Sequence, residues 1–137
     1  MKKIILGLAL SIAFASCSKN SEQIEVAKKD LKKSSTPDSE IENYKYDVVE
    51  IADRDIYKIL SDLRKKRSKE FYGVGSFENA SEQMDLASVY LDSLEKAKGD
   101  KFFYKVHFYR TVDKDTVSES ILYLNDKNQK IGSEYLK

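Results

Sequence analysis

The stretch FFYKVHFYRTVDKDTVSESILYL, residues 102–124, decides the fold of this chain. Two runs rich in β-branched and aromatic residues, Phe102–Val112 and Thr116–Leu124, flank the polar triplet DKD. Such runs favour strands, and clustered aspartates favour a turn between them. A second polar cluster over 125–129 precedes a last run from Lys130 to Leu136. The stretch and its continuation therefore predict an antiparallel meander of three strands.

Alternation along the first of these strands gives it two different faces. One face carries Phe102, Tyr104, Val106 and Phe108, and the other carries Phe103, Lys105, His107 and Tyr109. The first face is the more apolar, so we expect it to pack on helices. An odd-length turn brings Leu122 and Leu124 to that face on the next strand. An even-length turn brings Ile121 and Tyr123 there instead, so the register stays open.

The residues before this stretch predict one strand and a first helix. Tyr44–Ile51 carries Tyr, Val and Ile in a short run and predicts a strand. A helix follows over 54–69, opened by Asp53 or the residue beside it. Its apolar side chains recur at helical spacing: Ile56, Ile59, Leu60 and Leu63.

A second helix is predicted over 79–98. Asn79, with Glu82 three residues later, is typical of a capping box, and Gly99 suits a left-handed helix stop. We expect the inner stripe of this helix to consist of Met84, Ala87, Tyr90, Leu91 and Leu94. Between the helices, the sequence FYGVGSF over 71–77 predicts a loop, because two glycines permit unusual backbone angles.

The predicted order is strand, helix, helix and three strands. Packing two helices on one face of a small antiparallel sheet hides all three apolar surfaces, so we expect an α+β fold with the order β-α-α-β-β-β. On this prediction residues 44–137 form a single domain. The element order resembles the cystatin-like and NTF2-like architectures, in which helices lie on a curved sheet. The resemblance is one of element order, and it implies no particular activity.

The N-terminus, MKKIILGLALSIAFASC, has the layout of a secretory signal, with two lysines, an apolar run and small residues before the only cysteine. The apolar run, Ile4–Ala15, is shorter than the roughly 20 residues that cross a bilayer as a helix. Phe14–Cys17 resembles the lipobox of bacterial lipoproteins, although that family more often has an aliphatic residue where Phe14 stands. The resemblance covers residues 1–17 and implies lipidation of Cys17, cleavage just before it and acylation of the new N-terminus.

An ordinary signal peptide followed by an unused thiol is the alternative for Cys17. A lone cysteine has no disulfide partner, and its place after small residues favours lipidation. Each buried methylene of an acyl chain such as palmitate contributes about 0.8 kcal/mol, so several chains make a permanent membrane anchor. Ser18 stands where the inner-membrane retention signal of the family is typically Asp. The resemblance therefore implies an outer-membrane lipoprotein of the cell envelope.

The composition is that of a globular chain of nearly neutral charge. Charged residues make up 34% and hydrophobic residues 41%, with one proline. Loss of Lys2 and Lys3 with the signal changes the formal charge from +1 to −1. A chain with this charge is not built to bind nucleic acid as a whole, and export argues the same way.

Residues 18–43 contain no aromatic side chain and are rich in Lys, Glu, Asp and Ser. Such a segment buries too little apolar surface to offset the entropy of ordering it, so we expect a polar tether with a typical reach of about 28 Å. Ile24, Ala27 and Leu31 fall at helical spacing, which leaves a short helix over 22–33 as the alternative.

His107 is the only histidine, so a metal site built from several histidines is excluded, and we expect no metal and no cofactor. On the polar face of a strand it is expected to be exposed or hydrogen-bonded. The alternative is a general base or a ligand contact. The sequence contains no recognisable nucleophile or phosphate-binding motif, and we predict no catalytic residue and no enzymatic activity.

Two groups of residues are candidates for binding. The candidate binding surface joins the glycine-aromatic loop to the more polar strand face and comprises Phe71, Tyr72, Phe77, Phe103, Lys105, His107 and Tyr109. The alternative for the loop is a plug of the core. The candidate anion contact is the run Arg64, Lys65, Lys66 and Arg67. The alternative for this run is a solvated helix end that complements the helix dipole.

These features favour a membrane-anchored envelope lipoprotein whose domain binds an unidentified protein or small-molecule partner without catalysis. The alternative is a small ligand-binding or enzymatic domain with a cavity between helices and sheet.

Overall fold

The computed structural model describes residues 20–137, so the expected signal sequence and the lipidation site at Cys17 lie outside the described residues. A helix over residues 20–33, called the 20–33 helix below, comes first. The elements that follow it in chain order are α2 (Asp38–Ile41), β1 (Lys45–Ala52), α3 (Asp53–Gly73), α4 (Phe77–Lys96), β2 (Phe102–Val112), β3 (Asp115–Leu124) and β4 (Lys130–Tyr135).

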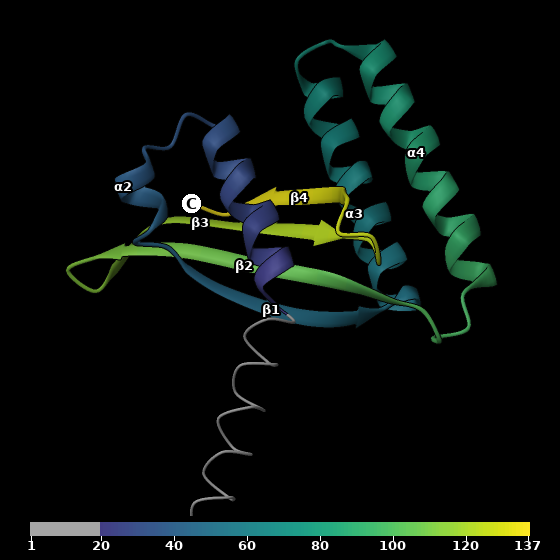
Figure 1. The fold of residues 1–137 in the computed structure, drawn as a ribbon. Helices are drawn as coiled ribbons and strands as arrows, with labels where there is room; N and C mark the ends of the chain where they lie inside the picture. Colours follow the sequence, from purple (N-terminus) through teal and green to yellow (C-terminus); the bar gives the residue numbers. More distant parts are fainter. Residues whose placement is uncertain (1–19) are drawn as a thin grey trace, which may run out of the picture. The chain divides into compact units, whose positions relative to one another are not determined.

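Four strands form one antiparallel sheet in the order β1-β2-β3-β4 (Figure 1). β3 and β4 pair antiparallel, with Ile121 opposite Glu134 and Tyr123 opposite Gly132. Helices and sheet together make an α+β fold, as predicted. β2, β3 and β4 each begin and end within one residue of the predicted ranges.

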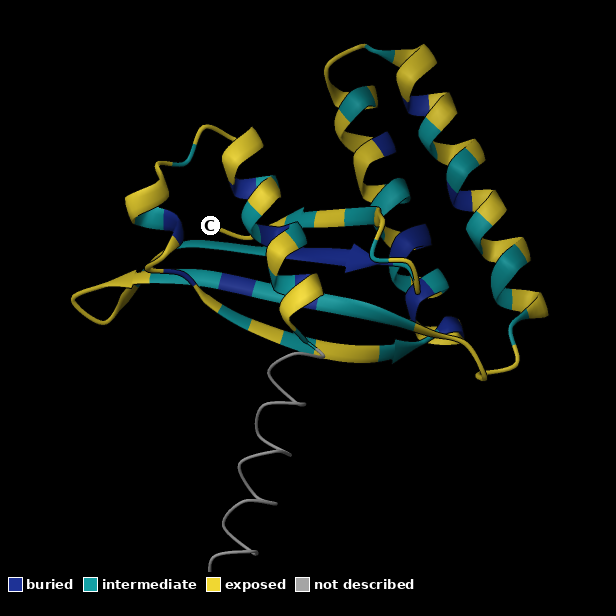
Figure 2. Cartoon of the chain, viewed as in Figure 1, coloured by how far each residue is buried: buried dark blue, intermediate teal, exposed yellow. Residues whose placement is uncertain are grey.

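The described chain divides into two compact units. Unit 1 comprises residues 20–49 and 105–137, and unit 2 comprises residues 50–104. We expected a single domain over 44–137, whereas the division runs through β1 and β2. Each unit has buried side chains of its own (Figure 2).

In unit 1 the polar clusters of the sequence form the two turns that join β2, β3 and β4. Asp113 and Lys114 connect β2 to β3 with φ of 50° and 73°, as in a type I′ turn, whose twist suits antiparallel strands. Between β3 and β4, Oδ1 of Asn125 accepts hydrogen bonds from the backbone N–H groups of Lys127 and Gln129, at 3.0 and 2.9 Å. The predicted turns are therefore present.

A contact between His107 and Glu119 fixes how β2 and β3 face each other. His107 Nε2 lies 2.7 Å from Glu119 Oε1, so the two side chains share one face of the sheet. Alternation along each strand then groups apolar side chains on the opposite face. Four of them are at most 1% exposed: Val106, Phe108, Leu122 and Leu124. This is the register that we associated with an odd-length turn, although the turn has two residues.

Residues 20–43, expected to be a polar tether, are folded. The 20–33 helix lies over the apolar face of the sheet in unit 1 (Figure 1). Ala27 is fully buried, Leu31 is 7% exposed and Ile41 of α2 is 2% exposed. The tether prediction is wrong for these residues, and the alternative helix is present. One narrow apolar stripe is enough here, because packing against a sheet stabilises a helix whose overall composition is polar.

Hydrogen bonds join the 20–33 helix to the β3–β4 turn and to the start of β4. Gln23 Nε2 donates to Asn128 Oδ1 at 2.8 Å, and Asn128 Nδ2 donates to Glu22 Oε2 at 2.9 Å. Lys130 Nζ donates to Asp30 Oδ1 at 2.9 Å. The helix is therefore held at its polar edge as well as through its apolar stripe.

Tyr44, Tyr46 and Phe108 form an aromatic cluster in unit 1, with ring centroids 6.1 to 6.4 Å apart. Tyr46 Oη donates to the backbone carbonyl of Ile41 at 3.0 Å. Burial, and next the negative charge of Glu42, raises the pKa of Tyr46 to about 12. The cluster connects β1 to α2 and to the buried face of β2.

Unit 2 contains the hairpin of α3 and α4, together with the adjoining ends of β1 and β2. Ser68 Oγ donates to the backbone carbonyl of Ala80 at 2.7 Å. Small residues on both helices are buried: Ser61, Ser68, Ala80 and Ala87. Because the distance between helix axes depends on the side chains at the contact, small residues bring α3 and α4 close together.

Both helices of unit 2 were predicted, but their ends differ from the prediction. α3 continues to Gly73, so the loop expected over 71–77 shrinks to three residues. The chain reverses at Gly75, which has φ of 77°. The predicted capping box is absent, since Asn79 lies within α4 and its Nδ2 donates to Ser76 Oγ at 2.7 Å.

Asp53 ties the start of α3 to the segment that leads into β2. Its side chain is almost fully buried, and its Oδ1 accepts hydrogen bonds from the backbone N–H groups of Arg54 and Gly99, at 2.7 and 2.8 Å. Its own N–H donates to the carbonyl of Lys101 at 2.8 Å. Gly99 has the expected positive φ, 81°, but α4 already ends at Lys96.

Candidate functional site

The seven residues predicted as one binding surface belong to two units. Phe71, Tyr72, Phe77 and Phe103 lie in unit 2, and Lys105, His107 and Tyr109 lie in unit 1. One candidate site lies on the sheet of unit 1, and another lies on the helical hairpin of unit 2.

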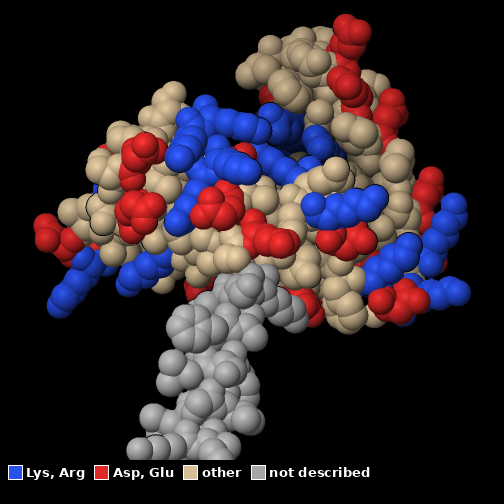
Figure 3. Space-filling view, viewed as in Figure 1, with Lys and Arg blue, Asp and Glu red and all other residues tan. Residues whose placement is uncertain are grey.

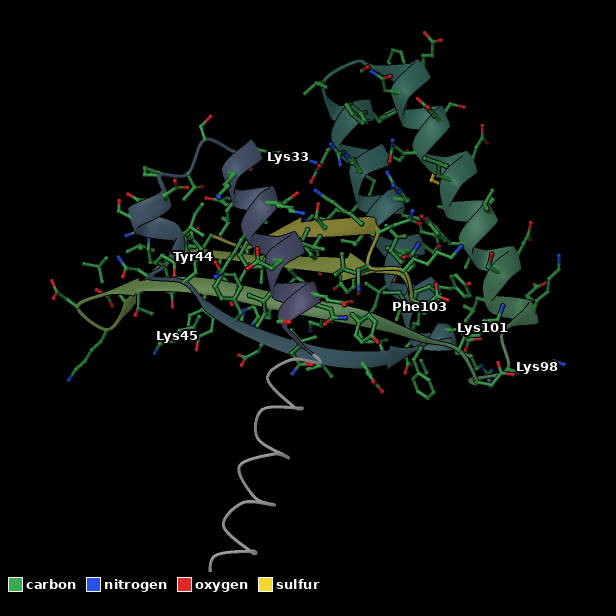
Figure 4. The ribbon with its side chains drawn as sticks, in the orientation of Figure 1. Lys33, Tyr44, Lys45, Lys98, Lys101 and Phe103 are labelled. Atoms are coloured by element: carbon green, nitrogen blue, oxygen red, sulfur yellow. The ribbon has the colours of Figure 1, made fainter. Side chains whose placement is uncertain are left out.

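On the sheet, His107 is held by its neighbours. Its Nε2 lies 2.7 Å from Glu119 Oε1, and its ring stacks on Tyr109 with centroids 5.2 Å apart. The side chains of His107 and Glu119 are each 30% exposed. Lys45 Nζ lies 6.0 Å from the centroid of the Tyr109 ring, and Figure 4 shows Lys45 and Tyr44 on opposite sides of the sheet. His107 is thus a hydrogen-bonded, half-buried residue in a polar patch.

A second carboxylate on this face is also engaged within the sheet. Tyr123 Oη donates to Glu134 Oε2 at 2.7 Å. Burial, and next this hydrogen bond, raises the pKa of Tyr123 well above its ordinary value. Glu119 and Glu134 therefore both have hydrogen-bond partners on neighbouring strands of this face.

Phe103 packs inside unit 2. Its ring meets Tyr57 of α3 edge-on, with centroids 5.6 Å apart, and Tyr57 stacks on Tyr90 of α4 at 6.5 Å. Phe103 therefore supports the hairpin from β2.

The connection between α3 and α4 displays large apolar side chains. Tyr72, Val74 and Phe77, called the hairpin tip below, are 68%, 79% and 62% exposed. The rings of Tyr72 and Phe77 meet edge-on, 5.2 Å apart. The N–H of Ser76 donates to the carbonyl of Phe71 at 2.9 Å, which holds the backbone of the connection. A cluster of large, solvent-exposed apolar side chains is typical of an interaction site.

Along α4 the exposed apolar surface continues from the tip. Phe77, Met84 and Leu91, called the apolar row, are spaced seven residues apart and line up on one face of the helix. We expected Met84 and Leu91 to be buried, but they are 46% and 38% exposed. Ala80 and Ala87 occupy the contact with α3 instead, which leaves larger side chains at its edge. The seven-residue spacing is the sequence signal that identifies this row.

The residues of the candidate anion contact point in different directions. Successive residues of a helix are rotated by about 100°, so a run of four goes round α3 and does not form one patch. Arg64 Nη1 donates to Gln83 Oε1 on α4 at 3.1 Å, whereas Lys66 and Arg67 are exposed. Acidic side chains follow the outer edge of α4 (Figure 3). The hairpin thus carries positive charge on α3 and negative charge on α4.

A groove of about 340 Å³ lies beside the 20–33 helix and α2 in unit 1. It is lined by Glu25, Lys28, Lys29, Lys32, Asp38, Ile41 and Glu42. Lys28 Nζ lies 3.8 Å from the carboxylates of Glu25 and Glu42, and Lys32 Nζ lies 3.8 Å from Asp38. Exposed ion pairs of this kind contribute at most about 1 kcal/mol each. Lysines and carboxylates balance in this lining, so it does not favour a ligand of either charge.

Among residues 20–137, no group of three or more His, Cys, Asp or Glu side chains is placed to hold a metal ion. Within the same residues, no helix combines the length and the apolar character needed to cross a membrane. Comparisons with protein-family models, with curated proteins and with solved structures find no match to this chain.

Proposed function

We propose that this protein is a lipid-anchored protein of the bacterial cell envelope whose folded part is a non-enzymatic binding module. The hairpin tip carries the proposal, because Tyr72, Val74 and Phe77 are all more exposed than buried. Burial of a large apolar side chain is worth about 1.5–3 kcal/mol. A partner that covers the tip gains this free energy.

The anchor in this proposal rests on the sequence of residues 1–17, with its lipobox-like end at Cys17. Ser18 favours the outer membrane over the inner membrane. The partner is then a protein or a small molecule of the envelope, and not a nucleic acid.

Labelled palmitate tests the anchor. Cells that produce the chain should incorporate the label into the wild-type protein and not into Cys17→Ser, and the wild-type protein should fractionate with membranes. Equal labelling of the two proteins, or no labelling of the wild type, would remove the anchor from the proposal.

Photo-cross-linking in intact cells tests the binding role. A photo-reactive amino acid in place of Val74 should give adducts of higher mass, because this side chain is 79% exposed at the tip. The matched control is the same replacement at Asp55, an exposed residue in the first turn of α3, at the opposite end of the helix from the tip. Equal adduct yields at the two positions would contradict a specific role for the tip.

A further inference from the structure

We infer that the partner of the α3–α4 hairpin is a second copy of this chain, with α4 packed parallel to its counterpart across a two-fold axis. The inference rests on the proposed binding role of the hairpin and names its partner. It follows from the order in which charged and apolar side chains lie on one side of the hairpin.

Contacts between the helices distinguish two sides of the hairpin. On one side, the Tyr57 ring stacks on Tyr90 and contacts the Phe103 ring, so a side chain of β2 covers this side of the hairpin. Tyr72 and Phe77 meet on the other side, called the outer side below. Because each residue of a helix is rotated by about 100° from the one before it, the side chains of Tyr90 and Phe77 project from α4 in directions about 140° apart.

Three rows of side chains run along the outer side. The basic row, on α3, consists of Arg54, Lys58, Lys65 and Lys69. The apolar row of α4 lies next to it. The acidic row consists of Glu78, Asp85 and Asp92. Each acidic residue follows a member of the apolar row by one position, so it points about 100° further from α3.

The seven charged side chains of the basic and acidic rows make no ion pair with any described residue. Six of them are exposed, and Lys65 is half-buried. Asp62 is the acidic exception on this side of α3, because it projects about 40° from Lys58 and 20° from Lys69. Across the outer side the net order is therefore basic, apolar, acidic, with the charges available to a partner.

The hydrogen bonds across the hairpin fix the heights of these residues along it. Ser68 Oγ donates to the carbonyl of Ala80, so these two residues lie level. Because the helices are antiparallel, a residue three positions before Ser68 lies level with one three positions after Ala80. Lys65 is therefore level with Gln83, and the hydrogen bond from neighbouring Arg64 to Gln83 agrees.

If two copies are related by a two-fold axis parallel to α4, equivalent residues stay at the same height. The basic edge of one outer side then lies opposite the acidic edge of the other. The apolar rows then meet, and the basic row of each copy meets the acidic row of the other. In three such pairs, the heights of the two residues along the helix differ by at most about two residues, or ~3 Å. The pairs are Lys69 with Glu78, Lys65 with Asp85, and Lys58 with Asp92. A two-fold axis perpendicular to the helices would instead place the basic row of one copy opposite the basic row of the other.

The proposed anchor would bring two copies of this chain into one membrane. Confinement to a membrane raises the effective concentration of the copies, so a modest interface is sufficient. The acidic row argues against an anionic lipid surface as the occupant, because like charges would then face each other.

Cysteine cross-linking of the full-length protein in cell membranes tests the inference. Met84→Cys and Leu91→Cys should each give a disulfide-linked species of twice the chain mass, because the axis places each residue opposite its counterpart. The matched control is Val89→Cys, since Val89 is 58% exposed on α4 but points about 140° away from Met84. The wild-type chain controls for Cys17. Equal dimer yields at positions 84 and 89, or no dimer at 84 and 91, would overturn the inference.

A charge exchange tests the orientation of the two copies. In the Met84→Cys background, Lys65→Glu alone and Asp85→Lys alone should each lower the dimer yield about tenfold, because like charges then face each other. The double variant should restore the yield. A double variant as weak as the single variants would overturn the parallel arrangement.

The two proposals fail in different ways. Adducts at Val74 with other proteins, without a dimer from Met84→Cys, would keep the binding role and overturn self-association. Absence of both the adducts and the dimer would overturn both.

Discussion

A single buried carboxylate, that of Asp53, holds together two segments of unit 2. Its Oδ1 accepts hydrogen bonds from the N–H groups of Arg54 and Gly99, and hydrogen bonds to charged groups are worth about 1.5–3 kcal/mol each. We expect Asp53→Ala to lower the free energy of unfolding by about 3 kcal/mol. Asp55→Ala, at an exposed position in the same helical turn, should lower it by less than ~0.5 kcal/mol. Urea unfolding at neutral pH measures both, and equal losses would contradict this role of Asp53.

Tyr46 is expected to make the free energy of unfolding fall as the pH rises into the alkaline range. Its pKa is raised from 10.0 to about 12, mainly by burial and next by Glu42, so the unfolded chain loses its proton first as the pH rises. The stabilisation is complete below pH 10 and is lost as the pH rises towards 12. Tyr46→Phe should therefore lose less stability than the wild type between pH 10 and about pH 12.

Urea unfolding across this pH range is the measurement for Tyr46. The control is Tyr135→Phe, which removes a hydroxyl group from a side chain that is 78% exposed. The pKa of Tyr123 is also raised, so Tyr123 makes the wild type and both variants lose stability as the pH rises. Identical pH dependence of Tyr46→Phe and the wild type would show that Tyr46 has no part in it.

Whole elements were the most predictable level of this structure. The alternation over 102–112 and the polar clusters around it predicted the strands and turns, because both signals are local. The buried side of α4 was predicted only in part, since Ala87 is buried as expected whereas Met84 and Leu91 are exposed. It depends on Ala80 and Ala87 meeting small residues of α3, and a periodic pattern alone does not distinguish the centre of a helix contact from its edge.

The β2–β3 turn offers a test at this level. Lys114 has φ of 73°, a left-handed conformation that costs a residue other than glycine about 1–2 kcal/mol. Lys114→Gly should therefore raise the free energy of unfolding by about 1 kcal/mol, since glycine adopts this φ freely. The control is Lys127→Gly in the β3–β4 turn, where φ is not positive and no gain is expected. Thermal or urea unfolding compares the two, and an equal gain would contradict the type I′ turn.

At the level of the whole chain, the sequence did not predict that residues 20–43 are part of the folded structure. Their composition is polar, and their partners are distant, as with Gln23 and Asn128, which are 105 residues apart. The candidate site was predictable in part for a similar reason. Tyr72 and Phe77 stood out beside glycines in a short segment, whereas the apolar row emerges only when α4 is known to present that face.

Limited proteolysis tests the place of the 20–33 helix. Ala27 is fully buried, so Ala27→Glu puts a charge into the interior of unit 1 and should release the helix. Thermolysin should then cut within residues 20–43 before it cuts elsewhere, whereas the wild type should resist. Lys33→Glu, at an exposed position of the same helix, should behave like the wild type. Early cutting of the wild-type chain in this segment would mean that the segment is not packed.

The early start of the folded chain determines how much freedom an anchored protein has. Ordered structure is present from residue 20, three residues after Cys17, and three residues span at most about 11 Å. If acyl chains are attached at Cys17, the start of the 20–33 helix stays within that distance of the anchor. Unit 1 is then confined to the region next to the lipid headgroups, and it meets partners by lateral diffusion in the bilayer.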